Sequence, residues 1–312
     1  MDISILLFLQ NLRSSLGGVF DEIFSFITMI AVDYYIIIIP LVIYWVFDKK
    51  KGLLVYLSLG LSCLLNAFLK ATFCIYRPWI RCSDIKPLES ALPGATGYSF
   101  PSGHSTCVSS TYSALANGYK KHKGIVVFSI VMIALTMFSR LFAGVHTPQD
   151  VLVGCLLGLF STSVVFAISR YLDSHPDKDW VILLVASIIT IAVLIYVTFK
   201  SYPQTYVDGM LLVDPATMRI NSYKDPGTFF GIVLAWFIER RYIKFNNDGT
   251  TYQKVMRSII GILLMIAYHC IVVNAIGKLI NSNIIHFLLR ASLPLIFICL
   301  YPLTWKRNIA ND

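Results

Sequence analysis

The chain has 312 residues, of which 56% are hydrophobic and only 14% are charged, and its mean hydropathy is +0.70. Soluble domains carry roughly 25% charged residues, so this composition excludes a soluble protein and predicts one embedded in a membrane. The net charge of +9 does not indicate nucleic-acid binding, because the basic residues gather in short clusters between apolar runs. There they set membrane topology and contact anionic lipid head groups.

Apolar runs of about 20 residues, long enough to cross a bilayer, recur along the chain, and they lack the period-2 alternation of membrane strands. Backbone groups in lipid must be hydrogen-bonded within each segment. The runs therefore predict an all-α, polytopic transmembrane bundle of about nine spans. The predicted spans are Phe24 to Phe47, Leu53 to Tyr76, Gly103 to Tyr119, Ile125 to Ala143, Gln149 to Tyr171, Trp180 to Phe199, Gly227 to Ile238, Ile259 to Ile276 and Ile284 to Leu303.

Three segments lie outside the predicted spans. Residues Ile3 to Leu12 are too short to cross a bilayer and predict an interfacial helix. The polar residues Trp79 to Phe100 predict a loop, as do residues Lys200 to Pro226. Four charged residues of the second loop form a candidate lid over a site, and the alternative is a solvated loop: Asp208, Asp214, Arg219 and Asp225.

The basic clusters also predict an orientation. In a nine-span count they all fall on one side, which the positive-inside rule makes cytoplasmic. The polar loop Trp79 to Phe100 and the ionisable residues of three further stretches fall on the opposite side. The cytoplasmic clusters are Lys49 to Lys51, Lys120 to Lys123, Arg170 with Lys178, Arg240 with Arg241, and Lys306 with Arg307.

The first of these stretches ends the second predicted span. Lys70 and Arg77 are seven residues apart, so on a helix they share one face. Pro78 disfavours helical geometry at Arg77 and predicts that the helix ends there. Two cations at the end of one helix can clamp an anion. The alternative is that both side chains reach out to lipid phosphates.

The second stretch is Phe100-Pro101-Ser102-Gly103-His104-Ser105. Ser102 suits a helix N-cap, and Gly103 lets a ligand approach the backbone closely. Free N–H groups at a helix start bind anions, and His104 lies where a general acid would be needed. The alternative is an ordinary capped helix with an incidental histidine.

The third stretch runs from Ser139 to Asp150 and contains Arg140 and His146 between two apolar runs. Ionisable residues at the edge of a membrane span indicate a functional site. Thr147-Pro148 predicts a helix start, so the Asp150 carboxylate can turn back toward His146 and select the tautomer of its imidazole. The alternative is that Asp150 only closes a capping box.

Together the three stretches resemble the motifs of the type 2 phosphatidic-acid phosphatase superfamily, which also includes vanadium haloperoxidases. The family motifs are lysine, six residues, Arg-Pro; Pro-Ser-Gly-His; and Ser-Arg, five residues, histidine, three residues, aspartate. Here they lie at Lys70 to Pro78, Pro101 to His104 and Ser139 to Asp150, and every spacing matches. The resemblance covers about Leu53 to Tyr171 and implies a six-span phosphatase core.

The predicted spans and the resemblance, taken together, predict an organisation for the whole chain. We expect an interfacial N-terminal segment (1–20), a phosphatase core membrane domain (21–200), and a loop with additional C-terminal transmembrane helices (201–312).

The resemblance further implies a role for each motif residue. His146 is the nucleophile that forms a phosphohistidine, Asp150 orients it, and His104 protonates the leaving group and then activates water. No metal or other cofactor is implied. The implied phosphate-binding residues are Lys70, Arg77, Arg140, Ser102 and Gly103.

The expected function is a membrane phosphatase that acts on a lipid phosphate or diphosphate outside the cytoplasm of a bacterial cell. Undecaprenyl diphosphate, phosphatidylglycerol phosphate, phosphatidic acid and sphingoid phosphates all suit the cations, so the lipid stays open, as does the oligomeric state. Two alternatives remain. One is phosphotransfer to an acceptor other than water, and the other is a transporter or scramblase whose polar cluster only binds phosphate. Cys74 and Cys82 are a candidate disulfide on the same face.

Overall fold

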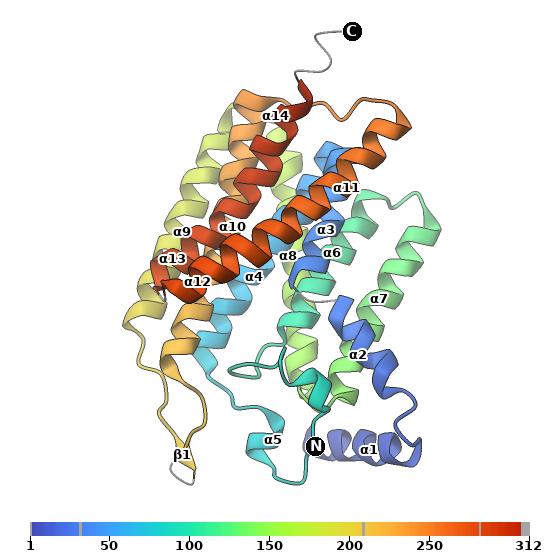
Figure 1. Ribbon diagram of the computed structural model, residues 1–312, viewed down its shortest axis with the longest axis vertical. Helices are drawn as coiled ribbons and strands as arrows, with labels where there is room; N and C mark the ends of the chain where they lie inside the picture. Colours follow the sequence, from blue (N-terminus) through green and yellow to red (C-terminus); the bar gives the residue numbers. More distant parts are fainter. Residues whose placement is uncertain (1, 31–32, 208–209, 281, 307–312) are drawn as a thin grey trace.

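The computed structural model describes every residue except 1, 31–32, 208–209, 281 and 307–312. The described residues form a bundle of helices with one pair of two-residue strands (Figure 1). The main helices are α1 (Asp2–Ser15), α2 (Asp21–Ile30), α3 (Asp33–Val42), α4 (Lys49–Phe73), α5 (Pro78–Arg81), α6 (Gly103–Gly118), α7 (Lys123–Phe142), α8 (Pro148–Ser174), α9 (Asp179–Phe199), α10 (Pro215–Ile238), α11 (Thr251–Ala267), α12 (Asn274–Leu279), α13 (Asn283–Pro294) and α14 (Tyr301–Lys306).

Shorter elements join or extend these helices. The strands β1 (Tyr206–Val207) and β2 (Met210–Leu211) pair antiparallel, with Val207 opposite Met210. The remaining turns, of π-helical or 3-10 geometry, are Ile43–Phe47, Glu89–Ala91, Pro176–Lys178, Glu239–Ile243, Tyr268–Val273 and Leu295–Leu300.

The predicted polytopic helical bundle is confirmed. Within the described part of the chain, six helical segments are long and apolar enough to cross a membrane, and they contain α4, α7, α8, α9, α11 and α13. The shorter apolar segment Ile36–Phe47 and the helices α6 and α10 run along the same bundle (Figure 1). Together these nine segments correspond to the nine predicted spans.

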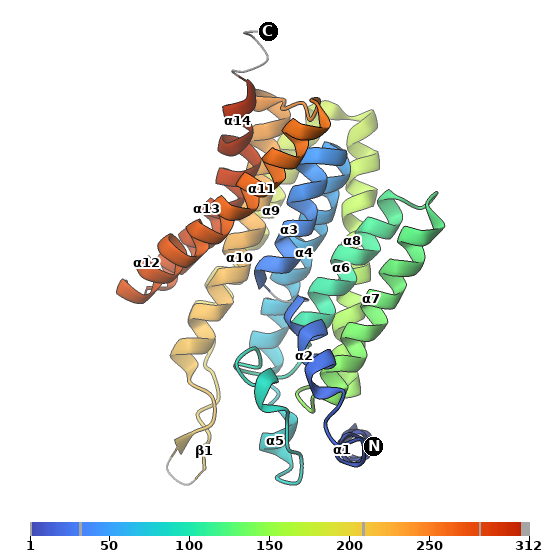
Figure 2. The same cartoon turned by 45° about the vertical axis from the view of Figure 1, so that its right-hand side comes forward.

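Helix α1 lies across the direction of the other helices, since it runs sideways in Figure 1 and is seen end-on in Figure 2. This orientation suits the predicted interfacial helix. The stretch predicted as the first span is described as α2 and α3, with residues 31–32 between them outside the description. Helix α2 packs against α7, where Phe24 contacts Phe142 with ring centroids 4.6 Å apart, whereas α3 packs against α4.

The predicted loop from Lys200 to Pro226 is wrong in its second half, because α10 begins at Pro215. The Asp214 carboxylate accepts hydrogen bonds from the backbone N–H groups of Ala216 and Thr217, and a proline follows it at the first helical position. These are ordinary start signals. Pro226 lies inside the helix, as prolines in membrane helices often do when neighbouring elements support the freed carbonyl.

This correction also changes the candidate lid. Arg219 and Asp225 lie on α10, and Asp214 caps it. Asp208, the fourth residue of the candidate lid, lies outside the described residues.

Small residues bring the second and third motifs together by letting α6 and α8 pack closely. A Cβ atom added at Gly154 would lie 2.6 Å from the Ser102 carbonyl oxygen, and one at Gly158 would lie 2.5 Å from the Ser110 nitrogen. The two backbones therefore touch without side chains between them, as membrane helices with small residues at the interface do. The Ser102 N–H donates to the Asp150 carbonyl at 2.9 Å, so the starts of the two helices are joined directly.

Candidate active site

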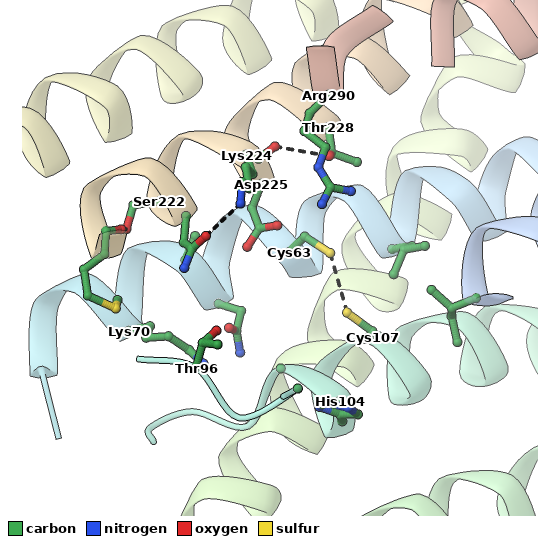
Figure 3. Close-up of a pocket in the computed structure, with 18 of the residues that line it drawn as sticks. Cys63, Lys70, Thr96, His104, Cys107, Ser222, Lys224, Asp225, Thr228 and Arg290 are labelled. Carbon is green, nitrogen blue, oxygen red and sulfur yellow. Dashed lines mark hydrogen bonds between the residues drawn. The ribbon is translucent and has the colours of Figure 1, made fainter. Parts of the chain in front are cut away.

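A cavity of about 350 Å³ lies between α4, α6, α10 and α13 (Figure 3). Residues from all three predicted motifs line it, although they come from distant parts of the sequence. These residues are Lys70, Arg77, Gly103, His104 and His146. The cavity therefore brings together residues of all three predicted motifs.

Arg77 joins the first motif to the third. Its guanidinium is buried, with 3% of the residue exposed. Nε donates to the Gly97 carbonyl at 3.1 Å, Nη2 to the Thr96 carbonyl at 3.1 Å, and Nη1 to the Val145 carbonyl at 3.0 Å. Nη1 also lies 2.9 Å from Nε2 of His146. The planar guanidinium of arginine can donate to several fixed acceptors at once. Arg77 therefore joins the loop that contains Thr96 and Gly97 to the loop that contains Val145 and His146.

This contact with Arg77 assigns the tautomer of His146. A guanidinium has only donors, so Nε2 must accept and the ring proton must lie on Nδ1. Nδ1 faces Oδ2 of Asp150 at 3.5 Å and Oγ of Ser99 at 3.4 Å. Burial, together with the nearby cations Arg77 and Arg140, lowers the pKa of His146. The result is a neutral imidazole whose Nε2 lone pair points toward the cation cluster.

Asp150 satisfies both interpretations that the sequence left open. Its Oδ2 accepts from the Thr147 N–H at 2.7 Å, and the Thr147 hydroxyl accepts from the Asp150 N–H, which completes a capping box. The same Oδ2 accepts from the Ser99 hydroxyl at 2.6 Å and faces His146. One buried carboxylate therefore caps α8 and lies beside Nδ1 of the imidazole.

Ser99 is a site residue that the sequence analysis missed. It belongs to none of the three motifs, and a serine just before Phe-Pro-Ser-Gly-His carries no distinctive signal. Its backbone N–H donates to the Ile75 carbonyl at 2.7 Å, which holds this segment beside the end of α4. Tertiary contacts of this kind place the Ser99 hydroxyl between His146 and Asp150.

His104 lies in the first turn of α6 and faces the cavity (Figure 3). It is 8% exposed, and within the described part of the chain its Nε2 has no hydrogen-bond partner. A Cβ atom at Gly94 would lie 3.8 Å from its Cε1, so the glycine leaves room at the imidazole edge. A buried ring nitrogen that faces an open cavity is well placed to exchange a proton with a ligand.

The predicted phosphate-binding residues divide into two groups. Lys70, Arg77 and Gly103 line the cavity, and Gly103 leaves its backbone open because a Cβ atom there would lie 3.9 Å from the nearest side chain. Ser102 and Arg140 are fully buried and lie outside the lining. The Ser102 hydroxyl accepts from the Ser105 N–H as the α6 cap, so in this structure it stabilises the start of α6.

The sequence analysis also missed polar residues that α10 and α13 contribute to the cavity. Asp225 was predicted only as part of a candidate lid, and its neighbours up to Pro226 were assigned to the same loop, whereas Thr228 lay in a predicted span without a role. Arg290 lay unremarked inside an apolar run, although a charge in such a run is itself a functional signal. These residues are Asn221, Ser222, Lys224, Asp225, Thr228 and Arg290.

The candidate disulfide between Cys74 and Cys82 is wrong, because both are free thiols. Cys74 is the C-cap of α4, and its Sγ donates to the Ala71 carbonyl at 3.1 Å. The thiol is thus turned back along its own helix.

Comparison with known proteins agrees with this geometry. Residues 51–174 match the family model of the PAP2 superfamily, and residues 223–310 match that of the PAP2 superfamily phosphatase transmembrane extension. The first match contains all three motifs, and the second contains α13 and most of α10.

Curated relatives are similar over parts of their length. An undecaprenyl-diphosphatase of Sulfolobus acidocaldarius is 31% identical over 110 residues, which are 35% of this chain and 51% of the relative. Phosphatidylglycerophosphatase B of Bacillus subtilis is 34% identical over 116 residues, 35% of this chain and 53% of the relative. Undecaprenyl-diphosphatase BcrC of Bacillus subtilis is 27% identical over 178 residues, 55% of this chain and 86% of the relative.

The chain thus spans about half the length of the first two of these relatives. No solved structure matches it.

Proposed function

The chain belongs to the PAP2 superfamily, and on that premise we propose that it is an integral-membrane phosphatase that hydrolyses a lipid phosphate or diphosphate through a phosphohistidine. The observation that carries the proposal is the environment of His146. Its Nε2 accepts from Arg77, its Nδ1 faces Asp150, and it shares a cavity with His104 and Lys70. A nucleophile, an orienting group, an acid and fixed cations are what phosphoryl transfer requires.

In the first step, Nε2 of His146 attacks phosphorus, and the P–N bond forms as the P–O bond to the leaving group breaks. Protonated His104 gives its proton to the leaving oxygen. Lys70 and Arg77 neutralise the non-bridging oxygens, whose charge grows in the transition state. Because Arg77 contacts Nε2 in the free protein, the incoming phosphate must take over this N–H donor before the nitrogen can attack.

In the second step, neutral His104 takes a proton from water. The water oxygen attacks phosphorus, the P–N bond breaks, and the electron pair returns to Nε2 of His146. Asp150 and Ser99 keep the Nδ1 side of the ring in place throughout. We expect no metal ion to be needed, because fixed side-chain cations carry out the charge stabilisation.

We further propose that the cavity opens on the extracytoplasmic side of a bacterial plasma membrane. The ends of α6, α8, α10 and α14, which adjoin the basic clusters, lie together at one end of the bundle (Figure 1). The positive-inside rule makes that end cytoplasmic. The motif residues lie toward the other end, since they stand at or near the end of α4, the start of α6, the end of α7 and the start of α8.

The test is a panel of lipid substrates. Purified protein in detergent with a chelator is expected to release inorganic phosphate from a prenyl diphosphate, phosphatidylglycerol phosphate, phosphatidic acid or a sphingoid phosphate. Lys200→Gln, a cation outside the cavity lining, is a matched control and should behave like the parent. Absence of phosphate release from every member, or release only with added metal, contradicts the proposal.

The same preparation separates the two alternatives. A phosphotransferase would move labelled phosphate from the donor lipid to an acceptor lipid rather than to water. A transporter or scramblase would still move lipid in proteoliposomes when His146 is replaced by alanine.

The pH dependence follows from the lowered pKa of His146. A lowered pKa means that the neutral, nucleophilic imidazole persists at pH values at which an ordinary histidine, with a pKa of about 6.5, is already protonated. We therefore expect kcat/KM to hold as pH falls through about 6.5 and to decline only at lower pH. Arg140→Gln removes one of the cations that lower this pKa. The decline of kcat/KM on the acid side should therefore begin at a higher pH in this variant than in the parent.

The measurement is kcat/KM against pH, corrected for the second ionisation of the lipid phosphate, which is titrated separately. An acid limb at or above the ordinary histidine value, unchanged by Arg140→Gln, would contradict this assignment.

A further inference from the structure

The cavity has a second polar wall that the proposed chemistry does not use. Figure 3 shows Lys224, Asp225 and Arg290 across the cavity from His104. Lys224 and Asp225 lie on α10 and Arg290 lies on α13. Both helices belong to the region that matches the transmembrane extension rather than the catalytic family model. The cavity is therefore completed by residues from outside the catalytic region.

These charges lie within helices of a membrane bundle. Ionisable side chains at such depth are costly, face the protein interior, and mark binding or transport sites. Lys224 Nζ donates to Oδ1 of Asn221 at 2.9 Å, and Asn221 also lines the cavity. Lys224 is thus held along the wall of the cavity by a neighbour one turn earlier.

Two glycines hold α13 against α10 and so determine where Arg290 lies. Gly227 and Gly231 are four residues apart, the spacing at which membrane helices pack most closely. A Cβ atom at Gly227 would lie 2.4 Å from the Phe287 carbonyl oxygen, and one at Gly231 would lie 2.3 Å from that of Ala291. Arg290, next to Ala291, is therefore held at the helix contact beside the cavity.

The charge of this wall matches a particular ligand. Lys224 and Arg290 outweigh Asp225 by one positive charge. In the proposed mechanism the transferred phosphate is bound by the cations Lys70 and Arg77 beside His146. A bridging phosphate, such as the inner phosphate of a diphosphate or a phosphodiester, carries a single negative charge and is complementary to the second wall.

We propose that α10 and α13 form a second anion subsite that binds a phosphate group of the lipid beyond the one transferred to His146. This inference rests on the proposed phosphatase function. It assigns the substrate to lipids whose head group contains two phosphates. Two sources share this chemistry: a prenyl diphosphate, with the phosphates linked directly, and phosphatidylglycerol phosphate, with a glycerol between them.

The experiment uses matched substrate pairs and the full-length protein in detergent. One pair is a prenyl diphosphate and the prenyl monophosphate with the same tail, and the other is phosphatidylglycerol phosphate and phosphatidic acid. Arg290→Gln and Lys224→Gln should each lower kcat/KM for the two-phosphate member by about tenfold or more, the effect of one charge-assisted hydrogen bond, mainly through KM. For the one-phosphate member the change should stay within about twofold.

The pair that shows this selective loss identifies the spacing of the two phosphates. Arg290→Lys, which keeps the charge, should restore part of the lost discrimination, and Lys200→Gln should leave both members of each pair unaffected. Thermal melting of each variant reports whether the α10–α13 contact survives. A purely structural role would lower activity on both members together.

Several outcomes overturn the inference. Equal losses on both members of a pair, no loss on either, or a parent protein that hydrolyses only one-phosphate lipids would each do so. The proposed function fails separately, when the parent releases no phosphate from any lipid. The parent could hydrolyse both members of a pair in a reaction that requires His146, while Arg290→Gln and Lys224→Gln keep the parent's ratio of kcat/KM between the two members. In that case only the proposed subsite is wrong.

Discussion

His146→Ala is expected to lower kcat/KM for any lipid phosphate by about 10⁴-fold or more, the scale at which removing a nucleophile acts in other enzymes. The reason is that no other described side chain in the cavity combines a neutral ring nitrogen with an orienting carboxylate. Among the described residues His104 Nε2 has no hydrogen-bond partner, whereas Asp150 and Ser99 face the Nδ1 side of the His146 ring. Without Nε2 no P–N bond can form.

His104→Ala tests the same step from the leaving-group side. It is expected to abolish turnover of lipid phosphates, whose leaving alkoxide needs a proton. An aryl phosphate releases a leaving group that needs no proton. With this substrate the His104→Ala variant should therefore form the phosphohistidine, but it should not hydrolyse it, because no base activates water. His146→Ala should gain nothing from the better leaving group.

The measurement is phosphate release together with an acid-labile, base-stable label on the protein after incubation with labelled substrate. His122→Ala and His175→Ala are matched controls, since both histidines are exposed and lie away from the cavity. Retention of more than a small fraction of parent turnover by His146→Ala would remove it from the role of nucleophile.

Arg77→Lys is expected to lower both activity and stability, although it keeps the positive charge. The Thr96, Gly97 and Val145 carbonyls each lose a partner that a single ammonium cannot replace for all of them. A buried acceptor left without its donor costs about 1–3 kcal/mol, so the free energy of unfolding should fall by roughly 3 kcal/mol. The His146 Nε2 contact is lost as well, and kcat/KM should fall by about 10³-fold.

The measurement is the thermal midpoint in detergent together with kcat/KM. Arg81→Lys is the matched control, because Arg81 lies on the adjoining helix α5, is half-exposed and is outside the cavity lining. A variant Arg77→Lys with the parent melting temperature and the parent KM would show that the fork of hydrogen bonds does not organise the site.

Local chemistry explains why much of this site was predictable from the sequence. Ser102, Thr147 and Pro148 mark helix starts because they satisfy or avoid free N–H groups close to themselves in the chain. Asp150 faces His146 because a carboxylate at the third helical position turns back toward the residues at the start of its helix, here the N-cap Thr147 and His146 just before it. Both kinds of contact join residues that are close together in the sequence, so a short sequence motif is enough to predict them.

Other parts of the site depend on contacts that no short motif records. Ser99 reaches Asp150 through tertiary contacts, among them the hydrogen bond from its backbone to Ile75, just after the end of α4. Arg290 reaches the cavity only because Gly227 and Gly231 admit the backbone of α13. The start of α10 was missed for a different reason: Pro226 was read as a boundary, although Asp214 and Pro215 carried the true start signal.

By itself, the sequence determined that the chain is a membrane-embedded helical bundle, where most of its spans lie, and which histidines and cations follow one another at motif spacing. The reason is that hydropathy, capping and helical periodicity act over a single turn or a single bilayer crossing. The tertiary structure alone decided that Arg77 contacts Nε2 of His146, that Ser102 and Arg140 are buried outside the cavity lining, and that α10 and α13 contribute charged residues to that lining. Those facts depend on how closely one helix can approach another, which is decided by glycines and backbone carbonyls far apart in the chain.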